Sequence, residues 1–136
     1  MKGTYCLLLK LKKSKIKIGS LGLINFEKGY YIYIGSALNN FEKRIQRHLK
    51  KSKKKHWHID YLTTNKNIKI EKVFCKKSEK REECKVAKKI KKIGKPINNF
   101  GCSDCKCKSH LFKINKPTKI LNFKEISFRK TFKNKK

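Results

Sequence analysis

The first residues that could do chemistry lie within residues 29–49, GYYIYIGSALNNFEKRIQRHL, where a tyrosine-rich strand pattern leads into a basic helix pattern. Arg44 and His48 are four residues apart, so on a helix their side chains lie on one face. Arginine can hold a phosphate through two parallel hydrogen bonds, and a neighbouring histidine can assist a base or a leaving group. The alternative for His48 is structural, because the helix dipole favours a histidine near the C-terminal end.

A second candidate is Glu83, on a helix that Ser78 is expected to cap and that runs to Ile93 before Gly94 stops it. At about 100° per residue, Glu83 shares the apolar face that includes Ala87. A carboxylate on the core side of a helix is costly unless it is paired or bound to a metal. Glu83 is therefore a candidate ligand for a divalent cation.

The third group is a cysteine cluster near the end of the chain, with the spacing C-x₂-C-x-C-x₂-H. Cys102, Cys105, Cys107 and His110 supply four soft ligands, which suit tetrahedral Zn²⁺. Closed structural zinc sites usually take their ligands as two separated pairs, whereas these four lie close together in one loop. The alternatives are a tight loop of core thiols, or a reactive group that includes Asp104.

The segment HWHID offers His56 and His58 on alternate positions, followed by Asp60. Such a set could bind a metal or orient a catalytic side chain, and His58 is the stronger candidate of the two histidines. The alternative is a packed segment with three buried apolar side chains, Trp57, Ile59 and Leu62.

Strand patterns surround these candidates. Residues 3–11 and 67–74 read as strands, and residues 16–26 as a hairpin arm interrupted by two glycines. Residues 30–35 read as a central strand on which alternate side chains share a face. One face, with Ile32 and Ile34, is expected to be core, whereas the face that carries Tyr31, Tyr33 and Gly35 is expected to be polar and aromatic.

The basic helix is expected to begin near Asn39, where Asn39 and Glu42 fit a capping-box variant. Phe41, Ile45 and Leu49 recur every four residues and form its apolar stripe. The sequence KKSKKK of residues 50–55 then follows as a strongly basic loop.

The composition bounds the class of protein. With 136 residues the chain suits one domain, and its formal net charge of +30 favours a polyanionic partner, nucleic acid first and an anionic membrane surface second. Lysine far outnumbers arginine, so a scattered, solvated lysine surface is an alternative reading of that charge. The chain has neither an apolar run of about 18 residues nor a secretory leader pattern. We therefore expect a cytoplasmic protein without a membrane span, and its six cysteines are not expected to form a disulfide framework.

Taken in order, GTY at residues 3–5, YIG at 33–35 and the following FEKRIQRH resemble the signature of the GIY-YIG nuclease superfamily. In that superfamily the two tripeptides lie on neighbouring strands, an arginine follows on the first helix, and a glutamate on a later helix binds a divalent metal. The resemblance assigns these roles to four residues: Tyr5, Tyr33, Arg44 and Glu83.

More closely, GYYIYIGSA, RIQRH, HWHIDYL and FGCSDCKCKSHLF together resemble the DUF123 branch of that superfamily, over about residues 2–114. The branch is seen in archaea and bacteria and is sometimes fused to a base-excision glycosylase, which implies an association with such an enzyme. The chain departs from the superfamily pattern in two places. Thr4 stands in the middle of the first tripeptide, and the gap between the tripeptides is longer and carries the glycine-containing arm.

The implied chemistry agrees with the residues. Hydrolysis of a phosphodiester needs a base for the attacking water, a cation on the phosphoryl oxygens and help for the leaving group. Either Tyr5 or Tyr33 could be the base if a metal or an arginine lowers its pKa from about 10. The sequence leaves open which of the two tyrosines it is. Arg44 would steady the phosphate, and Glu83 would bind a Mg²⁺ or Mn²⁺ ion that arrives with the nucleic acid. Contacts to the nucleic-acid backbone are expected from the basic residues Arg47, Lys50, Lys51, Lys53, Lys54 and Lys55.

The expected fold is α/β (α+β), with a small, largely antiparallel central sheet flanked by helices, as in GIY-YIG nucleases. Residues 1–114 are expected to form the DUF123 domain and residues 115–136 a basic C-terminal extension. The expected function is divalent-metal-dependent cleavage of DNA at damaged or branched structures in repair. One alternative is a non-catalytic DNA- or RNA-binding protein on a nuclease-like scaffold, and another is a structural zinc protein of a ribonucleoprotein.

Overall fold

The structure is a computed structural model that describes residues 3–37, 40–80, 82–101, 109–117, 120 and 123–126. Its centre is strand β1 (Gly3–Leu11), which pairs in antiparallel fashion with β4 (Gly29–Ala37) on one side and β5 (Ile68–Lys77) on the other. Three short strands extend this sheet: β7 (Leu111–Ile114) beside β4, β6 (Gly94–Pro96) beside β7, and β8 (Lys124–Ile126) beside β5. All of these pairings are antiparallel, which confirms the predicted α+β class.

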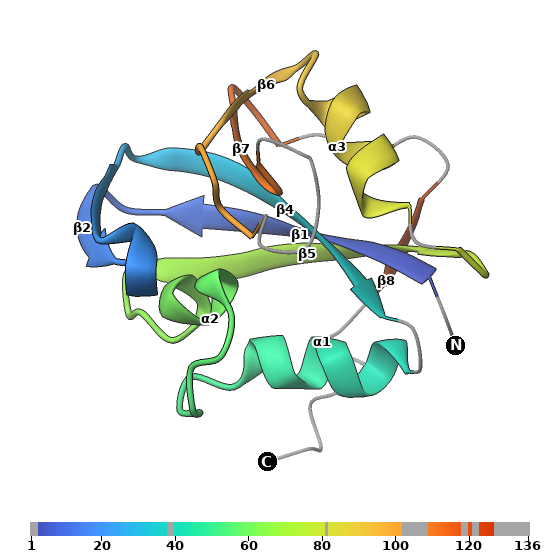
Figure 1. Cartoon of the computed structure of the whole chain (residues 1–136), viewed down its shortest axis with the longest axis horizontal. Helices are drawn as coiled ribbons and strands as arrows, with labels where there is room; N and C mark the ends of the chain where they lie inside the picture. Colours follow the sequence, from blue (N-terminus) through green and yellow to red (C-terminus); the bar gives the residue numbers. More distant parts are fainter. Residues whose placement is uncertain are drawn as a thin grey trace.

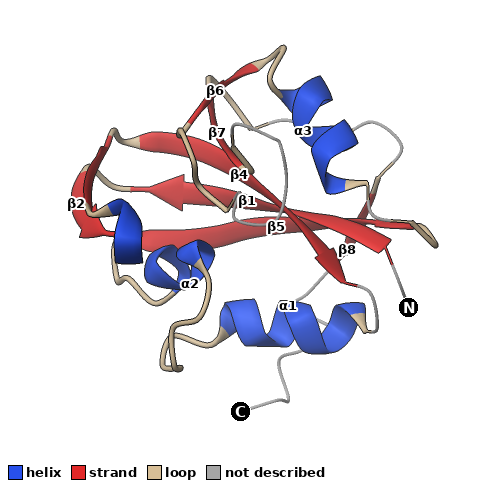
Figure 2. Cartoon of the chain, viewed as in Figure 1, coloured by secondary structure: helices blue, strands red, loops and turns tan. Residues whose placement is uncertain are grey.

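Helices cover both faces of the sheet (Figures 1 and 2). Helices α1 (Phe41–Leu49) and α2 (His58–Thr63) lie on one face, called here the α1 face. Helix α3 (Glu83–Ile90) lies on the opposite face, called here the α3 face. Each face buries its own apolar cluster, so residues that alternate along β1 and β4 enter two different cores.

The predicted hairpin arm is a separate two-stranded sheet of β2 (Ser14–Lys17) and β3 (Leu23–Phe26), joined through the 3₁₀ turn η1 (Gly19–Leu21). Gly22 has a φ of 78°, a conformation that favours glycine. The arm adds Ile16, Ile18 and Phe26 to the core of the α1 face. It therefore widens the cover over that face.

The expectation that Tyr31 and Tyr33 lie on a polar face outside the core is wrong. Both residues are buried on the α1 face, because α1, α2 and the arm cover it. The Tyr31 hydroxyl donates to the backbone carbonyl of Glu27 at 2.8 Å. A tyrosine can thus bury its ring and still satisfy its hydroxyl at the rim of the core.

Two predicted helix boundaries differ from the structure. Helix α1 is capped by Asn40, whose side chain accepts from the Lys43 N–H at 3.2 Å, whereas Asn39 lies outside the described residues. Helix α3 begins at Glu83, because the Ser78 hydroxyl is bonded to Lys80 within its own turn.

The end of α3 also differs from the prediction. The helix stops at Ile90, before the predicted Ile93, which is 55% exposed. Gly94, expected only to stop the helix, is the first residue of strand β6.

The segment predicted as a basic extension contributes β8, which pairs with the edge of β5. There the Lys72 ammonium lies 3.6 Å from the Glu125 carboxylate. In the described part of the chain, no helix is long and apolar enough to span a membrane.

Candidate active site

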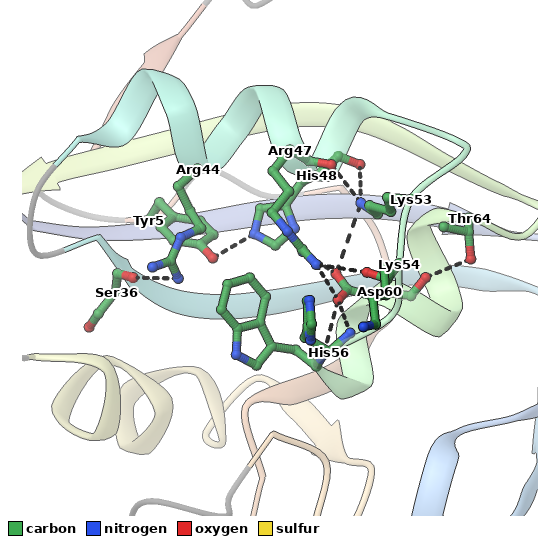
Figure 3. Close-up of polar contacts among 11 residues, drawn as sticks. Tyr5, Ser36, Arg44, Arg47, His48, Lys53, Lys54, His56, Asp60 and Thr64 are labelled. Atoms are coloured by element: carbon green, nitrogen blue, oxygen red, sulfur yellow. Dashed lines mark hydrogen bonds and ion pairs between the residues drawn. The ribbon is translucent and has the colours of Figure 1, made fainter.

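A buried pair from β1 and α1 forms the centre of the candidate site. The Tyr5 hydroxyl lies 2.6 Å from His48 Nε2, and both residues are about 1% exposed. The Tyr33 ring, from β4, lies 6.4 Å from the Tyr5 ring and 6.1 Å from the His48 ring, measured between centroids. Figure 3 shows the tyrosine hydroxyl pointing at the imidazole. The structure therefore brings together three residues that the sequence singled out.

Gly35 provides the space for this pair. It lies directly opposite Tyr5 in the β1–β4 pairing, so both residues face the same side of the sheet. A Cβ atom at Gly35 would overlap the hydroxyl and the ring of Tyr5. The glycine of the YIG tripeptide thus lets the Tyr5 ring lie flat over β4 and reach helix α1.

Arg44 lies at the edge of this group (Figure 3). It donates from Nη1 to the backbone carbonyl of Ser36 at 3.1 Å, which anchors the guanidinium beside the end of β4. Its positive charge also acts to lower the pKa of Tyr5, against the larger effect of burial. A guanidinium has five N–H donors, so Arg44 can hold the chain and a phosphate at the same time.

The protonation states of the pair follow from burial. Burial raises the pKa of Tyr5 well above its usual value, and the opposing effect of Arg44 is smaller. Burial, followed by the positive charge of Lys53, lowers the pKa of His48 to about 3. At neutral pH a neutral phenol therefore faces a neutral imidazole. When Tyr5 donates to Nε2, the imidazole proton lies on Nδ1, which has no hydrogen-bond partner among the described residues.

A second polar group joins α1 to the start of α2. Arg47 donates two hydrogen bonds to Asp60, at 2.6 and 2.8 Å, and Asp60 is fully buried. The backbone N–H groups of His56 and Trp57 also donate to Asp60 Oδ2, at 2.8 and 2.9 Å. Burial raises the pKa of Asp60, but the bonds from Arg47, Trp57 and His56 outweigh it and lower this pKa to about 2. We call this group the Arg47–Asp60 clamp (Figure 3).

Some of the basic residues predicted to bind nucleic acid instead form hydrogen bonds within this chain. Besides its bonds to Asp60, Arg47 donates to the Lys54 carbonyl at 3.1 Å. Lys53 donates to the Arg47 carbonyl at 2.6 Å near the C-terminal end of α1, and its side chain is 7% exposed. Lys51 donates to the carbonyl of Ile68 at 2.8 Å. These three cations fasten the basic loop to the domain.

The other predicted basic residues, Lys50, Lys54 and Lys55, are exposed. The Lys55 ammonium lies 5.8 Å from the centre of the Tyr61 ring. The loop thus has an inner set of cations that bind the domain and an outer set that faces solvent.

Glu83 is the first residue of α3, the helix of the opposite face. Its charge raises the pKa of His110, against the larger effect of burial, which lowers it. The Sγ atom of Cys84 lies 3.9 Å from His110 Nε2. Glu83, Cys84 and His110 are therefore neighbours at the N-terminal end of α3.

Gly101 connects this group to the tyrosines. A Cβ atom at Gly101 would lie 3.4 Å from the Cβ of His110 and 3.6 Å from the Tyr33 ring. The Gly101 N–H donates to His58 Nδ1 at 2.8 Å, so the proton of a neutral His58 lies on Nε2. His58 therefore holds the backbone next to Tyr33, and its role as a metal ligand or as a group that orients a catalytic side chain stays a prediction.

The predicted zinc ligands Cys102, Cys105 and Cys107 lie outside the described residues. His110 is described and is buried. Within the described ranges, no three side chains of the metal-binding types lie together.

Trp57 is the clearest departure from the sequence analysis, which grouped it with buried residues. It is 41% exposed, and the guanidinium carbons of Arg44 and Arg47 lie 4.6 and 4.4 Å from its ring centre. Its position among histidines and lysines, three residues before Asp60, was the available signal. The pairing of Arg47 with Asp60, 13 residues apart in the chain, was missed as well.

The fold and the site define a small α+β protein with a buried tyrosine–histidine pair beside an arginine. The family model of DUF123, a domain of unknown function, matches residues 4–133, so the chain belongs to the DUF123 family. No curated protein and no solved structure matches the chain.

Proposed function

We propose that this DUF123 chain is a divalent-metal-dependent endonuclease that hydrolyses phosphodiesters in DNA, on a scaffold related to the GIY-YIG nucleases. The observation that carries the proposal is the 2.6 Å contact between Tyr5 and His48, with Tyr33 and Arg44 beside it. These residues come from the two tripeptide strands and the following helix, which is the order of the superfamily signature. The net charge of +30 supports a polyanionic substrate.

The pair can accept the proton of an attacking water. As the water oxygen bonds to phosphorus, its proton passes to the Tyr5 oxygen, while the Tyr5 proton passes to His48 Nε2. The phenol stays neutral in this exchange, so its raised pKa does not oppose the step. The pKa of about 3 at His48 does oppose it, and the negative charge of a bound phosphate would raise that pKa by favouring the imidazolium. The P–O bond to the leaving oxygen breaks, and that oxygen takes a proton from solvent. The imidazolium of His48 then returns its proton to the Tyr5 oxygen, and Tyr5 releases its own proton to solvent, which restores the neutral pair.

Arg44 is the group that faces the phosphate in this proposal. A guanidinium aimed at the phosphoryl oxygens stabilises the charge that develops on them. Because Tyr5 is about 1% exposed, the bound DNA can reach its hydroxyl only if side chains that cover it shift.

The metal requirement rests on Glu83. Its two neighbours, the Cys84 thiol and the His110 imidazole, are softer ligands than Mg²⁺ prefers. The Glu83 carboxylate is a suitable oxygen donor, and a single carboxylate suits an ion that arrives with the phosphate. When bound, Mg²⁺ or Mn²⁺ would neutralise charge on the phosphoryl oxygens.

A second candidate function is nucleic-acid binding without cleavage, on DNA or RNA. The burial of Tyr5 and His48 favours it, because a buried pair can serve packing alone. Both functions predict binding, whereas only the first predicts a metal-dependent cut.

The test is a nicking assay on supercoiled plasmid and on branched DNA, with Mg²⁺, with Mn²⁺ and with EDTA. His48→Gln should lower the rate by about 10²–10⁴-fold and Arg44→Ala by about 10²–10³-fold. Glu83→Gln should abolish the cleavage that depends on the ion. Lys28→Gln, which removes an exposed charge elsewhere, is the matched control and should cut like the wild type. If the wild-type protein binds DNA but cuts it with neither ion, the nuclease proposal is wrong and nucleic-acid binding without cleavage remains.

A further inference from the structure

Trp57 is the only tryptophan of the chain and is 41% exposed. A single apolar side chain exposed on a surface is common and does not by itself indicate a partner. Among the described residues two other large apolar side chains are exposed, Leu23 on the arm and Ile93 after α3. Trp57 differs from both because it contacts two guanidinium groups of helix α1.

The backbone of Trp57 is held firmly. Its N–H donates to Asp60 Oδ2 at 2.9 Å, and its carbonyl accepts from the Asp60 N–H at 3.0 Å. Asp60 is itself fixed by Arg47 through two hydrogen bonds. The Arg47–Asp60 clamp therefore sets the indole ring next to Arg44, which adjoins Tyr5.

The charge around the ring suits a polyanion. Arg44 and Arg47 contact the ring, and the exposed Lys54 and Lys55 precede it in the chain. An exposed indole among cations matches the two needs of a nucleotide, a flat surface for the base and positive charge for the phosphate.

We infer that Trp57 stacks on an unpaired base of the bound strand while Arg44 takes the adjacent phosphate. A base inside a duplex is already stacked on both faces, so the indole can reach it only after it leaves the stack. The site is thus specific for nucleic acid with unpaired nucleotides, such as single strands, bulges or branch points. This inference rests on the proposed function for its ligand, nucleic acid, and not for the cleavage.

The test is a binding titration of the full chain in EDTA, followed by the fluorescence of Trp57. The first ligand is a single-stranded 12-mer, and the second is an abasic strand of the same length and charge. Stacking on one base changes the dissociation constant by about 5- to 140-fold. The base-bearing strand should bind more tightly than the abasic strand by a factor in this range, and it alone should quench the indole strongly.

Variants separate stacking from packing. Because Trp57→Ala and Trp57→Phe lack the only tryptophan, their binding is followed by the anisotropy of a strand that carries a fluorescent label. Trp57→Ala should bind both strands with the affinity that the wild type shows for the abasic strand, and Trp57→Phe should keep part of the preference. Leu23→Ala, the matched loss of an exposed apolar side chain, should keep all of it. Equal affinity and equal quenching for the two strands with the wild type would overturn the inference, whether or not a variant folds.

The outcome is separable from that of the nicking assay. If quenching depends on the bases but no cleavage occurs at any metal concentration, the nuclease proposal is wrong and the stacking inference stands. If the wild type cleaves DNA but does not distinguish the two strands, the stacking inference is wrong and the nuclease proposal stands.

Discussion

The two faces of the sheet bury different kinds of side chain. Under α3 the core is built mainly from aliphatic residues of alternate strand positions, such as Leu8, Ile32 and Ile34. Under α1 and α2 the core also encloses ionisable groups, His48 and the fully buried Asp60 among them. The comparison suggests a division of labour, in which the aliphatic core under α3 supplies stability and the α1 face holds the tyrosine–histidine pair. The proposed metal ligand Glu83 stands outside this division, because it lies at the N-terminal end of α3.

The largest effect should come from the aliphatic face. Leu8→Ala removes a side chain that is 1% exposed and should lower the free energy of unfolding by about 2–5 kcal/mol. Urea denaturation followed by Trp57 fluorescence measures this change, with exposed Leu23→Ala as the control. The rate of DNA nicking per folded molecule should stay unchanged. A specific loss of nicking would contradict the division between the faces.

Next in size is Asp60→Asn, which keeps the shape of the side chain but leaves Arg47 without its counter-charge. Breaking a buried ion pair costs about 3–5 kcal/mol, and because the Arg47 side chain is 24% exposed we expect about 3 kcal/mol. The matched control is Glu125→Gln at the exposed pair with Lys72, which should cost about 0–1 kcal/mol. Similar losses at the two sites would mean that the clamp is no stronger than a surface ion pair.

Gly35→Ala should cost about 1–3 kcal/mol, because the new methyl group overlaps the Tyr5 phenol and pushes it away from His48. The same denaturation assay measures the loss. Combining Gly35→Ala with Tyr5→Phe should recover part of it, since the hydroxyl is the first atom to overlap. Strict additivity of the two changes would show that the phenol does not occupy the space over Gly35.

The smallest effect is a pH dependence from His48. Its pKa is about 3 in the folded chain and about 6.5 when unfolded, so the unfolded chain binds more protons between these values. The stabilisation from the neutral, buried imidazole is complete above pH 6.5 and is lost as the pH falls toward 3. Over the first unit below pH 6.5 the loss is about 1 kcal/mol.

Denaturation midpoints at pH 6.5 and 5.5 measure this slope. His48→Gln should make it shallower and leave the part due to His58 and His110, whose pKa values burial also lowers. Exposed His56→Gln should leave the slope as in the wild type. An equal slope in the wild type and in His48→Gln would exclude His48 as its source.

The sequence was a good guide to the strands and to the tyrosine, arginine and histidine of the site. The runs at residues 3–11 and 30–35 are apolar or aromatic enough to be strands in any context. The second run lies close in sequence to Arg44 and His48, whereas Tyr5 is 43 residues from His48. The faces of β4 were harder. The burial of Tyr33 depends on α1 and α2 arriving from elsewhere in the chain, which alternation along one strand does not reveal.

The parts that sequence missed depend on competition between local and distant partners. Ser78 is a good capping residue, but its hydroxyl bonds to Lys80 and the helix begins later. Trp57 is apolar, yet its backbone is tied to Asp60 and its ring lies against two arginines at the surface. In both places a polar contact decides the structure and overrides the preference of the side chain alone.

The central position of β1 also constrains how the chain can fold during synthesis. β1 is synthesised before both of its neighbours, β4 and β5, which end at Ala37 and Lys77. Leu7 and Leu9 therefore wait for their β5 partners, Val73 and Ile70, which follow 66 and 61 residues later in the chain. Contacts so distant in sequence slow folding and leave an apolar strand open to aggregation meanwhile. The high positive charge of the nascent chain, which repels other copies, counteracts that risk.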